Sequence, residues 1–276
     1  MDFELNEDQV AFADMATAFA RSELEPHAAK WDEESFFPVD VIRKAGEMGF
    51  ASLYSPESAG GLGLSRLDSS IIFERLSMGC TSTTAYLTIH NMVTWMVTSF
   101  AKPSVLERYA ESLISAQSLG SYCLTEPNAG SDAASLKTTA KMEGDHYILN
   151  GSKVFISGAG STDVLVVMAR TSGPGARGVS AIVVDAHSDG ISYGRKEDKM
   201  GWNSQPTRMI SFDNVKVPVE NLLSEEGEGF VLAMKGLDGG RINIASCSLG
   251  TAQQALNQAR TYMQERKQFG KQIGDF

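Results

Sequence analysis

The sequence has little cysteine and no excess of positive charge. Its three cysteines, Cys80, Cys123 and Cys247, are far apart and form no Cys-x-x-Cys pair. This pattern argues against a disulfide framework and against a metal site, and it suits a reducing compartment. The formal net charge of −10 argues against a nucleic-acid partner, because nucleic acids are held mainly by clustered lysine and arginine side chains.

The sequence also predicts neither a targeting segment nor a membrane span. The chain starts with Met1, Asp2, Phe3 and Glu4, which provide neither the cationic start nor the apolar core of a signal peptide. No apolar run approaches the length that crosses a bilayer. We therefore expect a protein of the cytoplasm if it is bacterial. If it is eukaryotic, we expect a protein of the mitochondrial matrix that has already lost its presequence.

The sequence pattern changes along the chain from helical to β-type and back to helical. From Asn6 to about residue 113 the pattern is helical, with Asn6 as the first cap and Pro26 ending the first helix. Further helices are expected near residues 39–48, 66–78 and 83–100. Between about residues 117 and 219, short β-type runs are separated by turn formers such as Asn150-Gly151, without helical runs between them. This spacing predicts an antiparallel sheet or barrel and disfavours a nicotinamide-binding unit.

Helical periodicity returns after Glu225, where apolar residues recur at steps of three and four. This apolar stripe consists of Ile242, Ala245, Leu249, Ala252, Leu256, Ala259 and Met263. A stripe of this kind needs partner helices, so we expect a bundle that continues beyond Phe276. The predicted fold class is α+β multidomain. It has an N-terminal helical domain (1–115), a central antiparallel β-barrel or sheet domain (116–223) and the start of a C-terminal helical bundle (224–276).

Three separated motifs carry chemistry. The first, Tyr122 to Asp132 with the sequence YCLTEPNAGSD, places hydroxyls, turn formers and bare amides in a loop that leaves an apolar strand. The second is FISG at 155–158 and the third is RKQFG at 266–270. Together and in this order they resemble the acyl-CoA dehydrogenase family, flavoenzymes that desaturate acyl thioesters. The resemblance covers essentially all of the chain.

The resemblance implies FAD as the cofactor, because protein side chains cannot accept hydride. The cofactor-binding residues that it implies are Tyr122, Cys123, Leu124, Thr125, Ser131, Phe155, Ile156, Ser157, Arg266, Gln268 and Phe269. In the family, the hydroxyl at the position of Ser157 bonds the flavin atom that accepts hydride. The arginine at the position of Arg266 reaches the FAD of a neighbouring subunit, which implies a homo-oligomer, either a dimer or a tetramer.

The same resemblance implies a substrate site but no catalytic base. Ser131, Asp238 and Arg241 match family positions beside the thioester and nucleotide parts of acyl-CoA. Some relatives carry the catalytic acid where Gly240 stands, and glycine has no proton-accepting group. Most members keep a glutamate base well after the third motif, which we expect beyond Phe276. We therefore assign no catalytic residue, and the sequence gives no metal-ligand spacing.

Each motif also has a plainer explanation when it is taken alone. The first loop could be an ordinary turn, and the Ser157 hydroxyl could satisfy local backbone. Arg266 could complement the carboxyl end of its helix, although lysine would serve equally well there. Asp238 and Arg241 could form an internal ion pair. The functional interpretation depends on the motifs occurring together.

Residues 79–86 and 201–208 are most similar to the branch of the family that converts isobutyryl-CoA to methacrylyl-CoA in valine degradation. One methylene in an apolar pocket is worth only about 1 to 3 kcal/mol, so 2-methylbutyryl-CoA and butyryl-CoA stay open as substrates. The resemblance implies an electron-transfer flavoprotein as the acceptor. Two alternatives are an acyl-CoA oxidase and a non-catalytic FAD- or CoA-binding module, or interaction subunit, that another chain completes.

Overall fold

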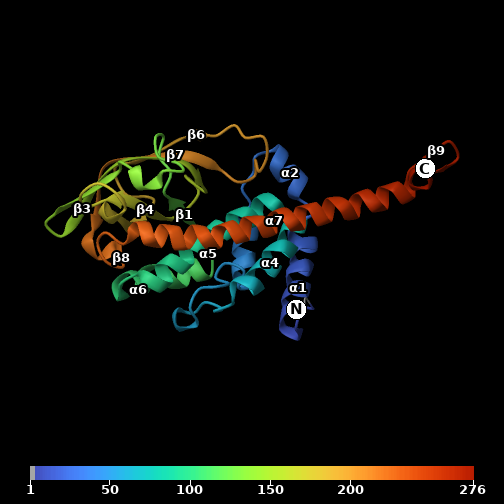
Figure 1. Ribbon diagram of the computed structural model, residues 1–276, viewed down its shortest axis with the longest axis horizontal. Helices are drawn as coiled ribbons and strands as arrows, with labels where there is room; N and C mark the ends of the chain where they lie inside the picture. The colour runs from blue at the N-terminus through green and yellow to red at the C-terminus, as the bar shows by residue number, and fades with distance from the viewer. Residues whose placement is uncertain (1–3) are drawn as a thin grey trace.

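Helices form the first part of the chain in the computed structural model, which describes residues 4–276 (Figure 1). In chain order the helices are α1 (Glu7–Phe19), the π-helical turn η1 (Ala20–Leu24), α2 (Ala28–Glu33), α3 (Val39–Glu47), the 3-10 turn η2 (Glu57–Ala59), α4 (Arg66–Gly79), α5 (Thr81–Phe100) and α6 (Pro103–Ile114). Residues 1–3, which belong to the start predicted to lack a targeting signal, lie outside the described residues.

Local sequence explains where these helices begin. Asn6 accepts a hydrogen bond from the Gln9 backbone N–H at 2.9 Å, and the Gln9 side chain accepts one from the Asn6 N–H, which completes a capping box. The predicted Asn6 cap is therefore confirmed. Pro103 starts α6, where a proline costs no helical hydrogen bond. The predicted helical pattern reaches about residue 113, but α6 was not among the individual helices predicted, the last of which ends near residue 100.

The middle of the chain forms an eight-stranded sheet. Its strands are β1 (Gly120–Cys123), β2 (Thr139–Glu143), β3 (His146–Ser157), β4 (Val164–Arg170), β5 (Val179–Asp185), β6 (Ile191–Lys196), β7 (Thr207–Pro218) and β8 (Leu222–Leu223). The order is β6-β7-β3-β2-β4-β5-β8, with β1 beside β4. Most neighbours are antiparallel, as predicted, but β1 and β2 each pair parallel with β4.

The predicted turn at Asn150-Gly151 is wrong, because β3 continues through both residues. The ladder with β7 shifts register between Leu149 and Gly151, where two residues of β7, Asp213 and Asn214, stand opposite Asn150. The irregularity is a bulge in β7, and β3 does not reverse there. Gly151 is required there, since its φ is 145° and Thr138 occupies the space that a Cβ would need.

Helix α7 (Gly229–Glu265) runs along the sheet and the helices and then projects beyond them (Figure 1). It packs against α4 through small residues, and Gly250 lies against the Glu74 carbonyl with no room for a side chain. The predicted apolar stripe faces away, and Ile242, Leu249 and Leu256 are each about half exposed. The projecting end carries a hairpin of β9 (Lys267–Gln268) and β10 (Lys271–Gln272), followed by the 3-10 turn η6 (Ile273–Asp275).

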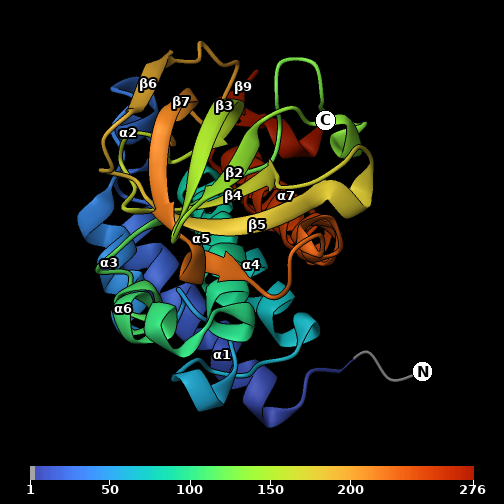
Figure 2. The ribbon, with the colours of Figure 1, turned by 90° about the vertical axis from the view of Figure 1, so that its left-hand side faces the viewer.

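The sheet and the helical layer share one apolar core, and Figure 2 shows the strands on one side of it and the helices on the other. Val164, Val166 and Met168 of β4 face α5 and α7, while Leu165 and Val167 face a second core on the other side. The boundaries predicted at residues 116 and 224 fall between elements, and the division into three domains stays a prediction. Within residues 4–276, no helix is both long and apolar enough to cross a bilayer.

Side chains of α5 fix the start of β1. The Tyr86 hydroxyl donates to the Gly120 carbonyl at 3.0 Å, and the Gly120 N–H donates to His90 Nδ1 at 3.1 Å. The proton of the His90 ring therefore stands on Nε2, which donates to the Leu113 carbonyl at 2.8 Å. Val93 leaves no room for a Cβ at position 120. Both backbone polar groups of Gly120 are thus held by one helix.

Because His90 is fully buried and neutral, we predict that it makes the fold sensitive to acid. Burial lowers the pKa of His90 from 6.5 to about 4, so its contribution to stability is complete above pH 6.5 and is lost as the pH falls toward 4. The loss is at most about 3 kcal/mol. Urea unfolding at pH 7.5, 6 and 5 should show a shallower pH dependence for His90→Asn than for the unchanged protein.

His27→Asn serves as the control, because His27 is exposed. This variant should keep the full pH dependence. An unchanged slope in His90→Asn would contradict the prediction.

Candidate active site

A cavity of about 290 Å³ opens between the sheet, α5 and α7. It brings together many of the residues that the sequence singles out for the cofactor and the substrate. Those that line it are Tyr122, Leu124, Thr125, Ser131, Phe155, Ile156, Ser157 and Arg241. Two segments about 30 residues apart in the sequence, the loop after β1 and the end of β3, therefore each form a wall of the cavity.

Strand alternation decides which residues of β1 reach the cavity. Tyr122 and Leu124 lie on the cavity side. Cys123 does not line it, because its fully buried side chain packs in the core on the opposite face of the sheet. Burial raises the pKa of this thiol to about 12, so it is an inert thiol and not a reactive one.

A bulge in β3 presents Phe155 at the second wall. The register with β7 shifts between Lys153 and Ile156, and Phe155 adopts a φ of 57°. An aromatic residue in this left-handed region is strained by roughly 1–2 kcal/mol. Its ring is nevertheless 65% exposed and lines the cavity. A strained, exposed aromatic side chain indicates a surface that contacts a ligand.

Three hydroxyls that line the cavity are free to bind a ligand. They belong to Thr125, Ser131 and Ser157. Among the hydrogen bonds of residues 4–276, none uses these side-chain oxygens, although the backbones beside them are firmly held. The Val154 N–H donates to the Thr125 carbonyl at 2.9 Å, and the Ser121 hydroxyl donates to the Ser157 carbonyl at 2.6 Å.

A buried ion pair lies behind the two walls. The Lys153 ammonium, with no exposed side-chain surface, lies 2.7 Å from Glu126 Oε1. It also donates to the Leu124 carbonyl at 3.0 Å. Burial lowers the pKa of Lys153 and opposes ionisation of Glu126, but the Lys153 charge and its hydrogen bond hold the pKa of the Glu126 carboxyl below its usual value. The carboxylate is therefore ionised.

The electrostatics of the cavity suit binding more than proton transfer. In the part of the chain that the structure describes, no aspartate, glutamate or histidine lines it. Its charged lining residue is Arg241, whose exposed guanidinium lies 2.6 Å from the Asp238 carboxylate. Asp238 itself does not line the cavity. Burial raises the pKa of Tyr122, so this phenol stays protonated.

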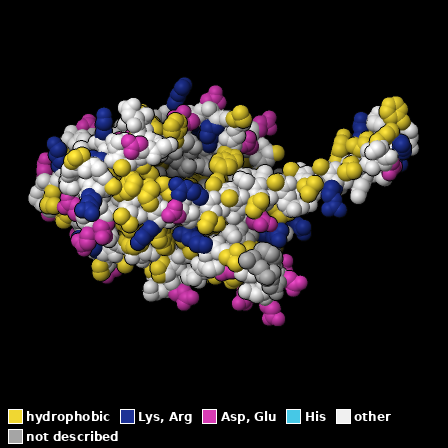
Figure 3. All heavy atoms as spheres, viewed as in Figure 1, with side chains coloured by type: hydrophobic (Ala, Val, Ile, Leu, Met, Phe, Trp, Pro, Cys, Tyr) yellow, Lys and Arg dark blue, Asp and Glu magenta, His cyan; other side chains and the backbone are white. Residues whose placement is uncertain are grey.

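The third motif lies far from this cavity. Arg266 directly follows α7, and Gln268 and Phe269 belong to the hairpin at its projecting end (Figure 1). Phe269 is 92% exposed, and apolar and basic side chains gather at this tip (Figure 3). Within one chain, these three residues are not brought together with the other predicted cofactor contacts.

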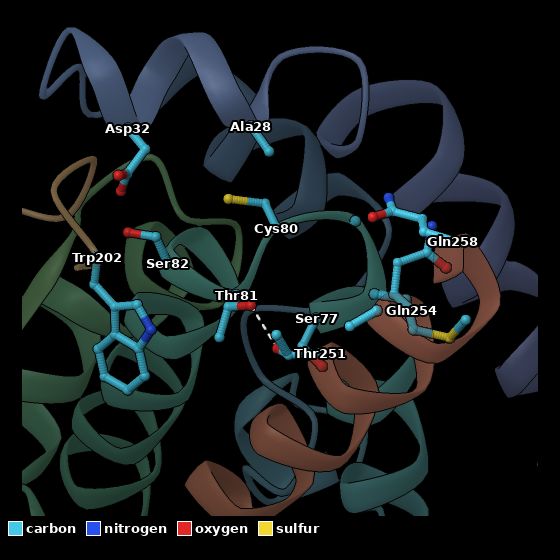
Figure 4. Close-up of a pocket in the computed structure, with 13 residues that line it drawn as sticks. Ala28, Asp32, Ser77, Cys80, Thr81, Ser82, Trp202, Thr251, Gln254 and Gln258 are labelled. Atoms are coloured by element: carbon cyan, nitrogen blue, oxygen red, sulfur yellow. Dashed lines mark hydrogen bonds between the residues drawn. The ribbon is translucent and has the colours of Figure 1, made fainter. Parts of the chain in front are cut away.

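A larger cavity of about 420 Å³ lies between α2, the start of α5 and α7 (Figure 4). Thr81 and Thr251 are hydrogen-bonded across one of its edges at 2.5 Å. Its carboxylate, Asp32, accepts two hydrogen bonds from Asn203, at 2.7 and 3.1 Å. None of the predicted site residues lines this cavity. Size alone therefore does not locate the chemistry, and the smaller cavity is the candidate site.

Sequence reasoning missed the helical side of the candidate site. Ile89 of α5 and Met234 and Leu237 of α7 give it an apolar wall. Their spacing is that of ordinary core residues, so the sequence carries no signal that separates them from buried packing. It also missed the Lys153–Glu126 pair, since a lysine in a strand is usually exposed.

Three regions of the sequence match the acyl-CoA dehydrogenase family. The N-terminal domain of that family matches residues 6–117, the middle domain matches 121–215 and the C-terminal domain matches 227–276. The matches follow one another in the order of the helical layer, the sheet and α7.

Individual relatives agree with this match. Mitochondrial isobutyryl-CoA dehydrogenase of Bos taurus is 53% identical over 271 residues, which cover 98% of this chain and 65% of the relative. The enzyme of the same description from Dictyostelium discoideum is 50% identical over 273 residues, 99% of this chain and 66% of the relative. Butyryl-CoA dehydrogenase from Megasphaera elsdenii superposes with a TM-score of 0.94 at 35% identity, over all of this chain and 74% of that structure. The chain thus spans about two thirds of the length of these two curated relatives.

The strain at Phe155 generates a second prediction. Phe155→Gly should change stability by less than about 1 kcal/mol, because relief of the left-handed strain offsets the entropy cost of glycine. The same substitution should weaken FAD binding about tenfold or more, because the aromatic wall is lost. Thermal unfolding and a fluorescence titration with FAD measure the two effects.

Ser35→Gly is the control, since Ser35 also has a left-handed backbone, with a φ of 50°, and lies outside the cavity. It should leave FAD affinity unchanged. Wild-type affinity in Phe155→Gly would remove this side chain from the site.

Proposed function

The chain belongs to the acyl-CoA dehydrogenase family, and we propose that, as part of the complete protein, it desaturates a short branched acyl-CoA. FAD is the cofactor of this family. The substrate that we propose is isobutyryl-CoA, which would be converted to methacrylyl-CoA in valine degradation. The complete reaction is a proposal about the whole protein, of which the chain spans about two thirds in comparison with its relatives.

One observation carries this proposal, namely that the two predicted segments line one cavity with three free hydroxyls. A flavin ring has flat apolar faces and an edge of hydrogen-bonding atoms. The cavity offers an exposed aromatic side chain in Phe155, and the unpaired hydroxyls of Thr125, Ser131 and Ser157 in the described structure. The residues present therefore fit the cofactor.

FAD, when bound, supplies the electron-pair acceptor that the side chains lack. The residues of the chain orient the bound molecules and stabilise the charge that develops during the reaction. Ser157 and Thr125 can donate hydrogen bonds toward the ring edge, where negative charge develops, and such bonds favour the transition state over the ground state. Ile89, Met234 and Leu237 exclude water and give the acyl group an apolar surface. No described residue that lines the cavity is suited to take the α-proton, so we assign no base.

The branched substrate is supported by two kinds of observation. The apolar side of the cavity is lined by the aliphatic side chains of Ile89, Met234 and Leu237, which suit a short acyl group. Two relatives at 50% identity or above are named isobutyryl-CoA dehydrogenase. Butyryl-CoA and 2-methylbutyryl-CoA differ from isobutyryl-CoA by the position or number of methyl and methylene groups, so discrimination rests on the fit of a few contacts.

We also propose a homo-oligomer and an electron-transfer flavoprotein as partners. Arg266 at the end of α7 and Phe269 in the hairpin that follows project away from the cavity of their own chain, so they would reach FAD only in a neighbouring subunit, in a dimer or a tetramer. A guanidinium suits the paired oxygens of a pyrophosphate. The three cysteines are free and buried, which supports a reducing compartment such as the mitochondrial matrix or the cytoplasm.

A second candidate function is a non-catalytic FAD- or CoA-binding module or interaction subunit. It is favoured by the lack of a carboxylate or histidine among the described residues that line the cavity. Under this function the chain would bind the cofactor without turning over substrate.

Anaerobic mixing of the complete, FAD-loaded protein with isobutyryl-CoA distinguishes these functions, because no described residue that lines the cavity can act as the base. We expect the flavin absorbance near 450 nm to bleach faster with isobutyryl-CoA than with butyryl-CoA, because the short branched group fills the apolar end of the cavity. Bleaching by neither substrate would leave the binding module. Rapid peroxide formation in air, without a flavoprotein acceptor, would identify an oxidase instead.

Ser157→Ala tests the proposed hydroxyl. Loss of one hydrogen bond that strengthens in the transition state should slow flavin reduction about tenfold or more, with a smaller effect on the affinity for CoA thioesters. Stopped-flow reduction and a binding titration separate the two quantities. Ser152→Ala, on the same strand but outside the cavity, should reduce at the normal rate. If Ser157→Ala reduced its flavin as fast as Ser152→Ala, Ser157 would have no role in the mechanism.

A further inference from the structure

We propose that the buried ion pair of Lys153 and Glu126 is a positioning device for the flavin site. It would set where the hydroxyls of Thr125, Ser131 and Ser157 stand relative to one another. The inference rests on the proposed function, since it concerns the cavity that we propose for FAD. Neither charged side chain lines that cavity, so both act through the segments that they hold.

The Glu126 carboxylate closes the loop that follows β1. Its Oε1 accepts from the Thr138 N–H at 2.9 Å as well as from Lys153, and its Oε2 accepts from the Lys137 N–H at 2.6 Å. One carboxylate therefore joins the beginning and the end of residues 126–138. We call this segment the Glu126 loop, and it carries Ser131 into the cavity.

The Lys153 ammonium joins the Glu126 loop to the opposite wall. It donates to Glu126 and to the Leu124 carbonyl, the residue directly before Thr125. Lys153 stands on β3 at the start of the bulge that turns Phe155 toward the cavity, four residues before Ser157. A single cation thus contacts the first wall while its own strand forms the second wall.

The fold has other means of holding these segments, which is why the pair points to positioning. Strand β3 pairs with β7 and β1 pairs with β4 through backbone hydrogen bonds, which do not use the charged side chain of Lys153. Burying two charges is costly, and apolar or neutral replacements of a buried pair are often no less stable. What a neutral pair loses is the strong, directional tie between the Glu126 loop and β3.

The surroundings of the Lys153–Glu126 pair also indicate that it positions the site and is not a general support of the fold. Cys123 lies close enough to feel the Lys153 charge, but it is neutral, so Glu126 is the partner that balances the ammonium. Glu126 is 7% exposed and Lys153 is fully buried, so water cannot replace either partner. Moving one segment therefore moves the other.

The double variant Lys153→Met with Glu126→Gln tests the proposal in the FAD-loaded protein. The glutamine keeps an acceptor oxygen for one of the two N–H groups, those of Lys137 and Thr138, which bond different oxygens of Glu126. The methionine keeps the length of the buried chain. We expect thermal unfolding close to that of the unchanged protein, an FAD dissociation constant raised about tenfold or more, and a shifted flavin absorption band. Substrate-dependent reduction should slow by a similar factor.

The matched control is Arg108→Met with Glu220→Gln, which neutralises an exposed pair between α6 and the 3-10 turn η5 (Val219–Asn221) at 3.1 Å. It should change none of these quantities. Wild-type FAD affinity, spectrum and rate in the Lys153/Glu126 double variant would overturn the proposal. So would a large loss of thermal stability in that variant, since the pair would then be a general support of the core. Failure of the unchanged protein to bind FAD would instead overturn the proposed function, and the positioning role with it.

Discussion

The burial of Lys153 is the constraint on which the candidate site depends. An ammonium group without access to water is tolerated only beside an opposite charge and further hydrogen-bond acceptors. Here Glu126 and the Leu124 carbonyl meet that need, and both belong to the segment that leaves β1. If the end of β3 and the loop after β1 separated, the charge of Lys153 would become exposed to water or would stay buried without a partner. The cavity lies where these two segments face each other, with its hydroxyls unpaired in the described structure.

A second constraint places the helical wall against the sheet. Gly120 begins the strand that leads to Tyr122, and α5 holds both its N–H and its carbonyl through His90 and Tyr86. The same helix contributes Ile89 to the cavity. The register of α5 on β1 is thus set by directional hydrogen bonds, whereas apolar packing alone would tolerate sliding. The apolar wall that we propose for the acyl group and the polar wall that we propose for the flavin keep their relative positions for this reason.

Much of this could be predicted from sequence, and the failures have physical causes. The Asn6 cap, the long C-terminal helix and the change from helix to strand depend on local patterns, and the structure shows all three. The prediction of a turn at Asn150-Gly151 was wrong because the same residue types occur in hairpin turns and beside a bulge of the partner strand, and only the pairing with β7 distinguishes the two. The predicted contacts at Thr125 and Ser157 rest on a motif, and the structure brings them to one cavity. The Lys153–Glu126 pair joins residues 27 positions apart, so no local pattern reveals it.

Two cations near the site illustrate how burial assigns a role. Arg241 lines the cavity and pairs with Asp238, but both side chains are largely exposed, so the pair contributes little and water can replace either partner. Arg241 can exchange Asp238 for another anion at low cost. Lys153 has no such freedom, because every alternative to Glu126 leaves a buried charge unpaired. We propose that this acidic protein, of net charge −10, binds anionic ligands. Arg241, an exchangeable cation at the surface, then serves recognition of the ligand. Lys153, a fixed cation behind the cavity wall, serves positioning.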